Sequence, residues 1–266
     1  MDNKMLSEIL QYKDLLVMLT FRDIRIRYKQ AAMGFLWALF MPVVAITAGL
    51  FIKQAIAMLS GSAIELTEVV SMSVKILPWT FFTNSLTFAV PSLVGNAQLV
   101  TKIYFPKAVL PLAAVFACFF DFLIATVVLA ALLFIYKIPI TLYILWLPAL
   151  MIMLMLISAG LSFFLAAANL FYRDIKYVVS IILQFGIFFS PVFYNAKDMG
   201  TWETWILLSP LGSVLEAIND TVVMRQAPHL GWTLYALVSS VAMLYFGLWF
   251  FKKKEPVFAE NIWFSG

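Results

Sequence analysis

Six apolar runs, separated by short polar segments, constrain the fold of this chain more than any other feature of its sequence. A helix of about 20 apolar residues crosses the roughly 30 Å of hydrocarbon in a membrane. The chain is 64% hydrophobic and 12% charged, whereas an ordinary soluble domain is roughly 25% charged. We therefore predict an all-α polytopic membrane protein with six transmembrane helices, at 34–52, 76–95, 108–136, 138–168, 178–194 and 231–251.

The distribution of positive charge predicts the orientation of these spans. Thirteen of the 18 lysine and arginine residues lie on one side of the predicted arrangement: six in 1–33, two near 100, two near 173 and three after 251. Positively charged loops stay in the cytoplasm. We expect a protein of the cytoplasmic membrane with both termini cytosolic. We also expect one domain, 1–266, in which 1–33 is a cytosolic or interfacial helix, 34–251 holds the spans and 252–266 is a cytosolic tail.

The segment before the first run is amphipathic. Val17, Phe21 and Ile24 recur at helical spacing beside a basic stripe, which is typical of a helix that lies in the membrane interface. A solvated lead-in to the first span is the alternative. The residues assigned to the interfacial helix are Arg22, Arg25, Arg27, Tyr28 and Lys29.

The loop 96–107 is more elaborate than a reversal of the chain requires. It predicts about two turns of amphipathic helix, followed by Pro106 and Pro111. A short amphipathic helix at a membrane surface can dock into another protein. The residues assigned to this docking role are Gln98, Leu99, Thr101, Lys102, Ile103, Tyr104 and Phe105.

The segment 195–230 is too long for a tight turn and too polar for a simple span. Leu207, Leu211, Val214 and Ile218 lie on one helical face, and Glu216, Asn219 and Asp220 lie off it. We expect two short re-entrant helices that dip back toward the bilayer, with Trp202 and Trp205 among the headgroups. An ordinary ordered loop is the alternative.

Residues for enzymatic chemistry are scarce. The chain has one histidine, His229, and one cysteine, Cys118, and it has no Gly-rich phosphate-binding loop. We expect no metal site, no bound cofactor and no ATP hydrolysis by the chain itself. The net charge of +4 is spread over the loops, and we relate it to orientation, not to nucleic-acid binding.

Asp121 is the one acidic residue deep in a predicted span. An ionised carboxylate facing lipid costs roughly 2.5–3.5 kcal/mol or more. It must face the protein interior, be protonated, or pair with a polar group on another span such as Gln184. An ion-coupling site and a structural hydrogen bond are both open, and the lack of a cationic partner favours the structural role.

Aromatic residues are abundant, and most must face lipid or the interface. Some can line a path in which ring faces stack against sugar CH groups. The candidates for a channel or gate are Trp37, Trp79, Phe81, Phe82, Asp121, Phe189, Tyr194 and Glu216.

Three stretches of the sequence and its C-terminal tail carry a recognisable pattern. They are Phe21-Arg-Asp-Ile-Arg-Ile-Arg-Tyr-Lys-Gln with Gly34-Phe-Leu-Trp-Ala and Pro42, Leu77-Pro-Trp-Thr-Phe-Phe through Thr101-Lys-Ile-Tyr-Phe-Pro-Lys, Phe171-Tyr-Arg-Asp-Ile-Lys-Tyr with Ser190-Pro-Val-Phe-Tyr, and the tail from Phe250 to Ile262. Together they resemble the membrane subunits of type-2 ABC exporters, in the branch that moves polysaccharides and related lipid-linked polymers such as O antigen, capsule or teichoic acid. A departure occurs at 208–211, Leu-Ser-Pro-Leu, where this family usually has Asn-Pro-Met. The resemblance implies that the 195–230 helices act as an outer gate.

The resemblance implies a homodimer with a conduit at its interface and two ATPase subunits that carry ATP and Mg²⁺. It also implies that 96–107 is the coupling helix, that the N-terminal helix braces the ATPase, and that the cargo is a lipid-linked polysaccharide surrounded by membrane lipids. Three alternatives are open: an ABC permease for a drug, lipid or small glycolipid, a non-transporting scaffold of polymer synthesis, and an ion-driven carrier that uses Asp121.

Overall fold

The structure is a computed structural model that describes residues 11–29, 66–135, 141–258 and 260–261, together with isolated residues and short stretches between 40 and 58. Within these ranges every regular element is a helix. The expected first span at 34–52 lies largely outside the described residues, as do Trp37 and the connection near Lys137.

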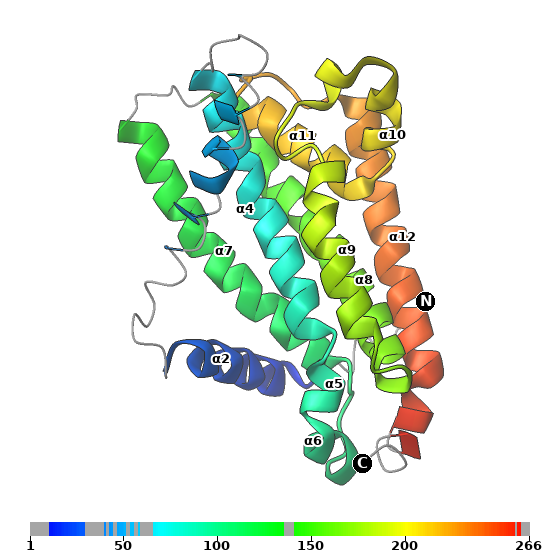
Figure 1. The fold of residues 1–266 in the computed structure, drawn as a ribbon. Helices are drawn as coiled ribbons and strands as arrows, with labels where there is room; N and C mark the ends of the chain where they lie inside the picture. The colour runs from blue at the N-terminus through cyan, green and yellow to red at the C-terminus, as the bar shows by residue number, and fades with distance from the viewer. Residues whose placement is uncertain are drawn as a thin grey trace.

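Five helices run along a common direction and alternate in sense as the chain passes from one end of the molecule to the other (Figure 1). Three stretches of the described chain are long and apolar enough to cross a membrane: Val109–Ala131, Leu142–Phe171 and Leu230–Val257. The five helices are α4 (Leu66–Ala89), α7 (Val109–Ile135), α8 (Leu147–Phe171), α9 (Ile175–Phe189) and α12 (Leu230–Lys254).

Two of the expected runs have different boundaries in the structure. Helix α4 begins at Leu66, ten residues before the expected start of the second span, because Ser71, Ser73 and Lys75 at this end are buried inside the protein and need not face lipid. The fourth run begins with a 3-10 turn, η1 (Leu142–Trp146), which leads into α8. Helix α9 is a shorter apolar helix.

The short elements gather at the two ends of the bundle (Figure 1). At one end lie α2 (Lys13–Lys29), α5 (Ser92–Gly95), α6 (Ala97–Lys102) and the 3-10 turn η3 (Glu255–Val257), and α2 lies across the long helices. At the other end lie η2 (Ala196–Trp202), α10 (Glu203–Leu207) and α11 (Pro210–Val222). The segment 195–230 is thus helical over much of its length.

Aromatic side chains fill the two halves of the core. Phe81 of α4 packs between Phe119 and Phe122 of α7, with ring centroids 5.8 Å and 5.4 Å away. Toward the α6 end, Phe251 of α12 lies against Phe163 of α8, with ring centroids 5.7 Å apart. Both clusters tie long helices to each other and set the positions of the ends.

Glycines allow α8 and α12 to approach closely. A Cβ atom built on Gly160 of α8 would lie 2.6 Å from the carbonyl oxygen of Met243, and one on Gly247 of α12 would overlap the carbonyl oxygen of Gly160. Small residues at a crossing permit this backbone contact between membrane helices. The α8–α12 pair is therefore a rigid part of the bundle.

Candidate functional site

The segment 97–107 forms a protruding tip at one end of the molecule. Helix α6 covers Ala97–Lys102, which is close to the two turns expected. It ends before Ile103, where the chain is extended. Phe105 precedes Pro106, and a residue before proline is biased away from the helical region. The buried side chain of Phe105 draws the chain back toward the core.

Side chains of the tip divide into anchoring and exposed groups. Phe105 is buried, and Leu99 and Thr101 are half-buried. Tyr104 is 95% exposed and Ile103 is 52% exposed, an unusual position for large apolar groups. The exposed members of the predicted docking set are Gln98, Lys102, Ile103 and Tyr104.

The C-terminal tail braces the base of this tip. The backbone N–H of Lys107 donates to a carboxylate oxygen of Glu255 at 2.8 Å, and the Lys107 ammonium donates to the carbonyl of Ile103 at 2.6 Å. Lys107 Nζ also lies 4.3 Å from the centroid of the Phe105 ring. Burial lowers the pKa of Lys107, and the nearby Glu255 carboxylate opposes that change. The C-terminal end of the tip is thus fixed to the C-terminal tail of the same chain.

Helix α2 is attached to α7 through the acidic residue that sequence reasoning left without a cation. Arg27 Nη1 donates to Asp121 Oδ2 at 2.6 Å, and the Tyr28 hydroxyl donates to Asp121 Oδ1 at 2.6 Å. Arg27 Nη2 also reaches Cys118 Sγ at 3.3 Å. Burial and the hydrogen bond to Asp121 raise the pKa of Tyr28.

The expectation that Asp121 lacks a cationic partner is therefore wrong. The suggested partner Gln184 is exposed on α9. Arg27, one of the residues assigned to the interfacial helix, points into the protein, where its guanidinium also lies 4.0 Å from the Phe88 ring centroid. The sequence offered one clue to this inward position. Arg27 lies three residues after Ile24, which on a helix places it beside the apolar stripe.

The protein-facing side of α2 also differs from the expected stripe. Val17 and Phe21 are exposed, whereas Leu19 is buried and Leu15 and Leu16 pack against the core. The exposed basic residues of the predicted set are Arg25 and Lys29. Arg22 donates to Asp23 and, at 3.0 Å, to the side-chain oxygen of Asn96. Helix α2 is thus joined to both α7 and the approach to α6.

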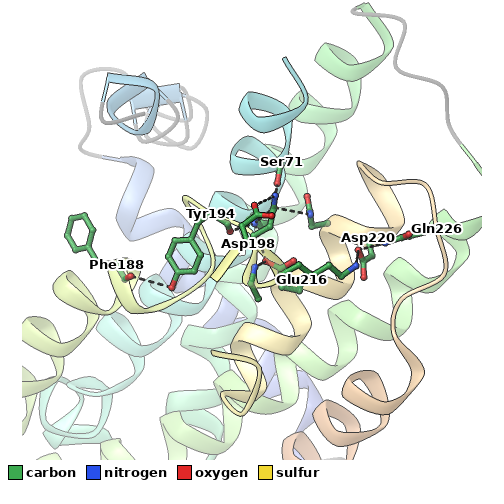
Figure 2. A network of polar contacts seen from close by, with 12 residues as sticks. Ser71, Phe188, Tyr194, Asp198, Glu216, Asp220 and Gln226 are labelled. Carbon is green, nitrogen blue, oxygen red and sulfur yellow. Dashed lines mark hydrogen bonds and ion pairs between the residues drawn. The ribbon is translucent and has the colours of Figure 1, made fainter. Parts of the chain in front are cut away.

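A buried ion pair organises the opposite end (Figure 2). Lys75 of α4 is 1% exposed, and its ammonium lies 3.2 Å from Glu216 Oε1 on α11. It also donates to the carbonyl of Tyr194 at 2.6 Å and to Asn195 Oδ1 at 3.0 Å. Burial raises the pKa of Glu216, and Lys75 and the Ala196 N–H oppose that change. The ammonium joins three parts of the chain that are distant in sequence.

Further polar contacts extend this network over η2 and α11 (Figure 2). Asp220 accepts hydrogen bonds from Gln226 at 2.7 Å and from Lys197 at 3.4 Å. The Ser71 hydroxyl donates to Asn195 Oδ1, and Asn195 Nδ2 donates to Asp198. Glu216 and Asp220 are buried. Helix α11 and the start of the 195–222 segment are therefore bonded to α4 through Glu216 and Asn195.

Sequence reasoning missed Lys75. The second run was taken to begin immediately after it, at Ile76. The clue in the sequence was the position of Lys75 between the apolar residues Val74 and Ile76. A buried lysine requires an acidic partner. Glu216 was a candidate, because it lies off the apolar face of the 195–230 segment.

The predicted channel residues that the structure describes lie in several different environments. Trp79, Phe81 and Phe82 are buried inside the helix bundle of the chain, and Glu216 is buried in the ion pair. Phe189, at the end of α9, is 81% exposed. Tyr194 is half-buried, and its pKa is raised by burial. Asp121 lies beside α2. The structure does not bring these residues together along one surface of the chain.

Long apolar antiparallel helices, an amphipathic helix across one end and a protruding polar tip beside it define a helical membrane protein. Comparison with known families is more specific. The family model described as "ABC-2 type transporter" matches residues 14–223, and the chain belongs to this family.

Curated relatives align with nearly the whole chain. Two proteins of Klebsiella pneumoniae named "O-antigen export system permease protein RfbA" are each 27% identical over 249 residues, which is 93% of this chain and 94% of the relative. A protein of Myxococcus xanthus with the same name is 24% identical over 266 residues, which is 97% of this chain and 99% of the relative.

Proposed function

We propose that this chain is the transmembrane subunit of an ATP-driven ABC exporter that moves a lipid-linked polysaccharide of the O-antigen type across the cytoplasmic membrane. The observation that carries the proposal is the full-length similarity to O-antigen export permeases. The scarcity of residues for hydrolysis in the sequence agrees with a permease that takes its energy from ATP and Mg²⁺ on a separate ATPase subunit.

The proposed architecture is a single domain, 1–266, with six spans and cytosolic termini. Five of these spans are the described helices α4, α7, α8, α9 and α12. The remaining span, which comes first in the chain, is 34–52. Two observations support this orientation. The ends that carry α2, α6 and the C-terminal helix lie together (Figure 1), and they contain most of the positive charge, which favours the cytoplasmic side.

Residues 97–105 of the tip are the proposed contact with the ATPase. Gln98, Lys102, Ile103 and Tyr104 are exposed there, while Phe105 and the Lys107–Glu255 hydrogen bond fix the base. A tip that is held rigidly at its base can pass a displacement of a partner to α7, which begins at Val109. Coupling requires such an element with two arrangements that the partner biases.

At the opposite end, η2, α10 and α11 are the proposed outer gate of a conduit between two copies of the chain. Exposed aromatic side chains such as Phe189, Trp202 and Trp205 are available to the partner copy, the lipid or the passing polymer. The ion pair of Lys75 with Glu216 would hold α11 in the position that the structure shows.

The test is reconstitution of the purified chain with its cognate ATPase in vesicles that contain lipid-linked polysaccharide. We expect ATP-dependent movement of the polymer with both subunits and none with either alone. In cells, replacing the exposed tip residues 102–104 by alanine should remove polymer from the surface while the protein stays in the membrane. Uphill movement by this chain alone, or normal surface polymer without an ATPase, would overturn the proposal.

A further inference from the structure

A cavity lies between α2 and the α4–α5–α7 corner, apart from the tip and the outer network. It encloses about 390 Å³, within the range of small-ligand sites. Figure 1 shows α2 beside α5 at this end. The residues that define its character are the apolar Ile26, Phe88 and Pro91 and the polar Arg22, Arg27 and Ser92.

The polar side of the cavity carries donors for an anion. Two arginines and one acidic residue, Asp23, line it, and Arg27 is also paired with Asp121. Each guanidinium has five N–H groups. The contacts described above use all three nitrogen atoms of Arg22 for Asp23 and Asn96 and the two Nη atoms of Arg27 for Asp121 and Cys118. Both arginines therefore keep N–H groups beyond these bonds, and guanidinium groups are well suited to phosphate.

Ser92 gives an independent indication of a ligand. It lines the cavity and is 8% exposed, and among the described residues its buried hydroxyl has no hydrogen-bond partner. Buried polar groups are almost always hydrogen-bonded, and an exception requires an explanation. With the Ser92 side chain turned toward the cavity, this O–H would donate to a phosphate oxygen held by the arginines.

The other wall of the cavity is apolar. Ile26 is 66% exposed and Phe88 is 43% exposed, and Pro91 and Ala114 continue this wall. Free phosphate gains no stabilisation from contact with an apolar wall. A phosphate attached to an acyl or isoprenoid chain would place the first methylene groups of that chain against the wall.

We infer that this cavity binds a phosphate group carried on a membrane lipid, with Arg22, Arg27 and Ser92 on the phosphate and Ile26 and Phe88 along the chain. A phospholipid headgroup and the diphosphate of a lipid carrier share this chemistry. The inference uses the membrane placement of the proposed function, but its test requires neither an ATPase nor export, so a failure of one leaves the other standing.

The test measures binding to the purified full chain in detergent with three probes: short-chain phosphatidylglycerol, farnesyl diphosphate and inorganic phosphate. We expect saturable binding of a lipid phosphate and none of inorganic phosphate at the same concentration. Tighter binding of phosphatidylglycerol identifies a phospholipid site, and tighter binding of farnesyl diphosphate identifies a carrier site. Both results support the inference, and binding of inorganic phosphate as tight as that of either lipid would overturn it.

Matched variants locate the site. Arg22→Gln should weaken lipid-phosphate binding about tenfold or more, because a hydrogen bond to a charged group is worth about 1.5–3 kcal/mol. Arg25→Gln removes the same charge from α2 at an exposed position outside the cavity and should bind almost as well as the original chain.

Ser92→Ala tests whether the Ser92 hydroxyl contributes to ligand binding or to the stability of the fold. Because the hydroxyl has no partner in the unliganded protein, this variant should keep the unfolding temperature of the unliganded chain and lose part of its rise on adding the lipid phosphate. Equal binding by Arg22→Gln and Arg25→Gln, or an unchanged lipid-dependent rise in Ser92→Ala, would contradict the inference.

Discussion

Arg27 on α2 lies 2.6 Å from Asp121 on α7, and the two residues are 94 positions apart in the chain. Their side chains are 16% and 19% exposed. The pair therefore attaches the amphipathic N-terminal helix to a candidate transmembrane helix at a largely buried point. A motion of either helix must carry the other with it unless this contact breaks.

The first prediction concerns this pair. Breaking a buried ion pair costs about 3–5 kcal/mol, and partial exposure here reduces our expectation to about 2 kcal/mol for Arg27→Gln. Asp121→Asn should cost about as much, because it leaves the Arg27 guanidinium without its anion. A double-mutant cycle on the free energy of unfolding in mixed micelles should give a coupling of about 1–2 kcal/mol.

The control for this cycle is Arg25→Gln, which removes an exposed charge and should show no coupling with Asp121→Asn. Additive effects of Arg27→Gln and Asp121→Asn would mean that the contact contributes nothing. Export by Asp121→Asn also distinguishes a structural role from ion coupling, because a carrier driven by an ion at Asp121 would lose activity.

The second prediction concerns the pair at the opposite end. Lys75→Met leaves the Glu216 carboxylate buried without its cation and should destabilise the chain by about 3–5 kcal/mol. Adding Glu216→Gln should recover much of this loss, because the remaining amide carries no charge. The matched control is Lys197→Met. Lys197 is 58% exposed at its ion pair with Asp220, and the expected loss is under about 1 kcal/mol.

The third prediction is a pH dependence that follows from the same carboxyl. Burial raises the pKa of Glu216 above its ordinary value of 4.5. The folded protein then binds this proton at a higher pH than the unfolded chain does, so the contribution of Glu216 to stability rises as the pH falls through the folded pKa toward 4.5. Glu216→Gln should remove this contribution. The check is to measure the unfolding temperatures of the original chain and of Glu216→Gln across that pH interval. A constant difference between the two temperatures would refute the prediction.

The membrane class and the helical fold were predictable because long apolar runs have few other structures available to them. The bounds of α7 and α12 lie within three residues of those expected, whereas α4 begins ten residues early and α9 ends five residues early. The family assignment, made from motifs such as Phe171-Tyr-Arg-Asp-Ile-Lys-Tyr, is confirmed by the family model. Helicity within 195–230 was also predictable from the spacing of its leucine, valine and isoleucine residues. Helix α11 contains Leu211, Val214 and Ile218, but Leu207, expected on the same face, ends the separate helix α10.

Pairings between distant residues were not predictable from these patterns. Periodicity places Arg27 and Lys75 on a helix but does not say which helix packs against it, so the partners Asp121 and Glu216 became apparent only in three dimensions. The helix of the tip also ended earlier than expected, at Lys102, because burial of Phe105 beside Pro106 outweighed the helical periodicity.

The fourth prediction concerns the crossing of α8 and α12. A methyl group on Gly247 would meet the backbone of Gly160, and backbone cannot give way as a flexible side chain does. Gly247→Ala should therefore destabilise the chain by about 1–3 kcal/mol. The control Gly95→Ala adds a methyl group with nothing within 4 Å and should be neutral or slightly stabilising in α5. Equal unfolding temperatures for the two variants would contradict the close approach.

The fifth prediction tests the side of the membrane on which the tip lies. Cys118 is the only cysteine in the sequence, and it is buried, so a cysteine introduced at an exposed position can be labelled selectively. Tyr104 at the tip is 95% exposed, and Trp205 at the opposite end is 69% exposed. In sealed vesicles with the cytoplasmic face inward, a membrane-impermeant thiol reagent should label Trp205→Cys and not Tyr104→Cys.

Inverting the vesicles should reverse the labelling, and the original chain with Cys118 alone is the background control. In the assembled exporter, Tyr104→Cys should in addition form a crosslink to the ATPase, and Trp205→Cys should not. The exposure of Tyr104 predicts that Tyr104→Ala lowers export without lowering the unfolding temperature, whereas Phe105→Ala, at a buried position, should lower both. Labelling of position 104 from the outer face would place the tip away from any cytosolic ATPase and would refute the coupling role.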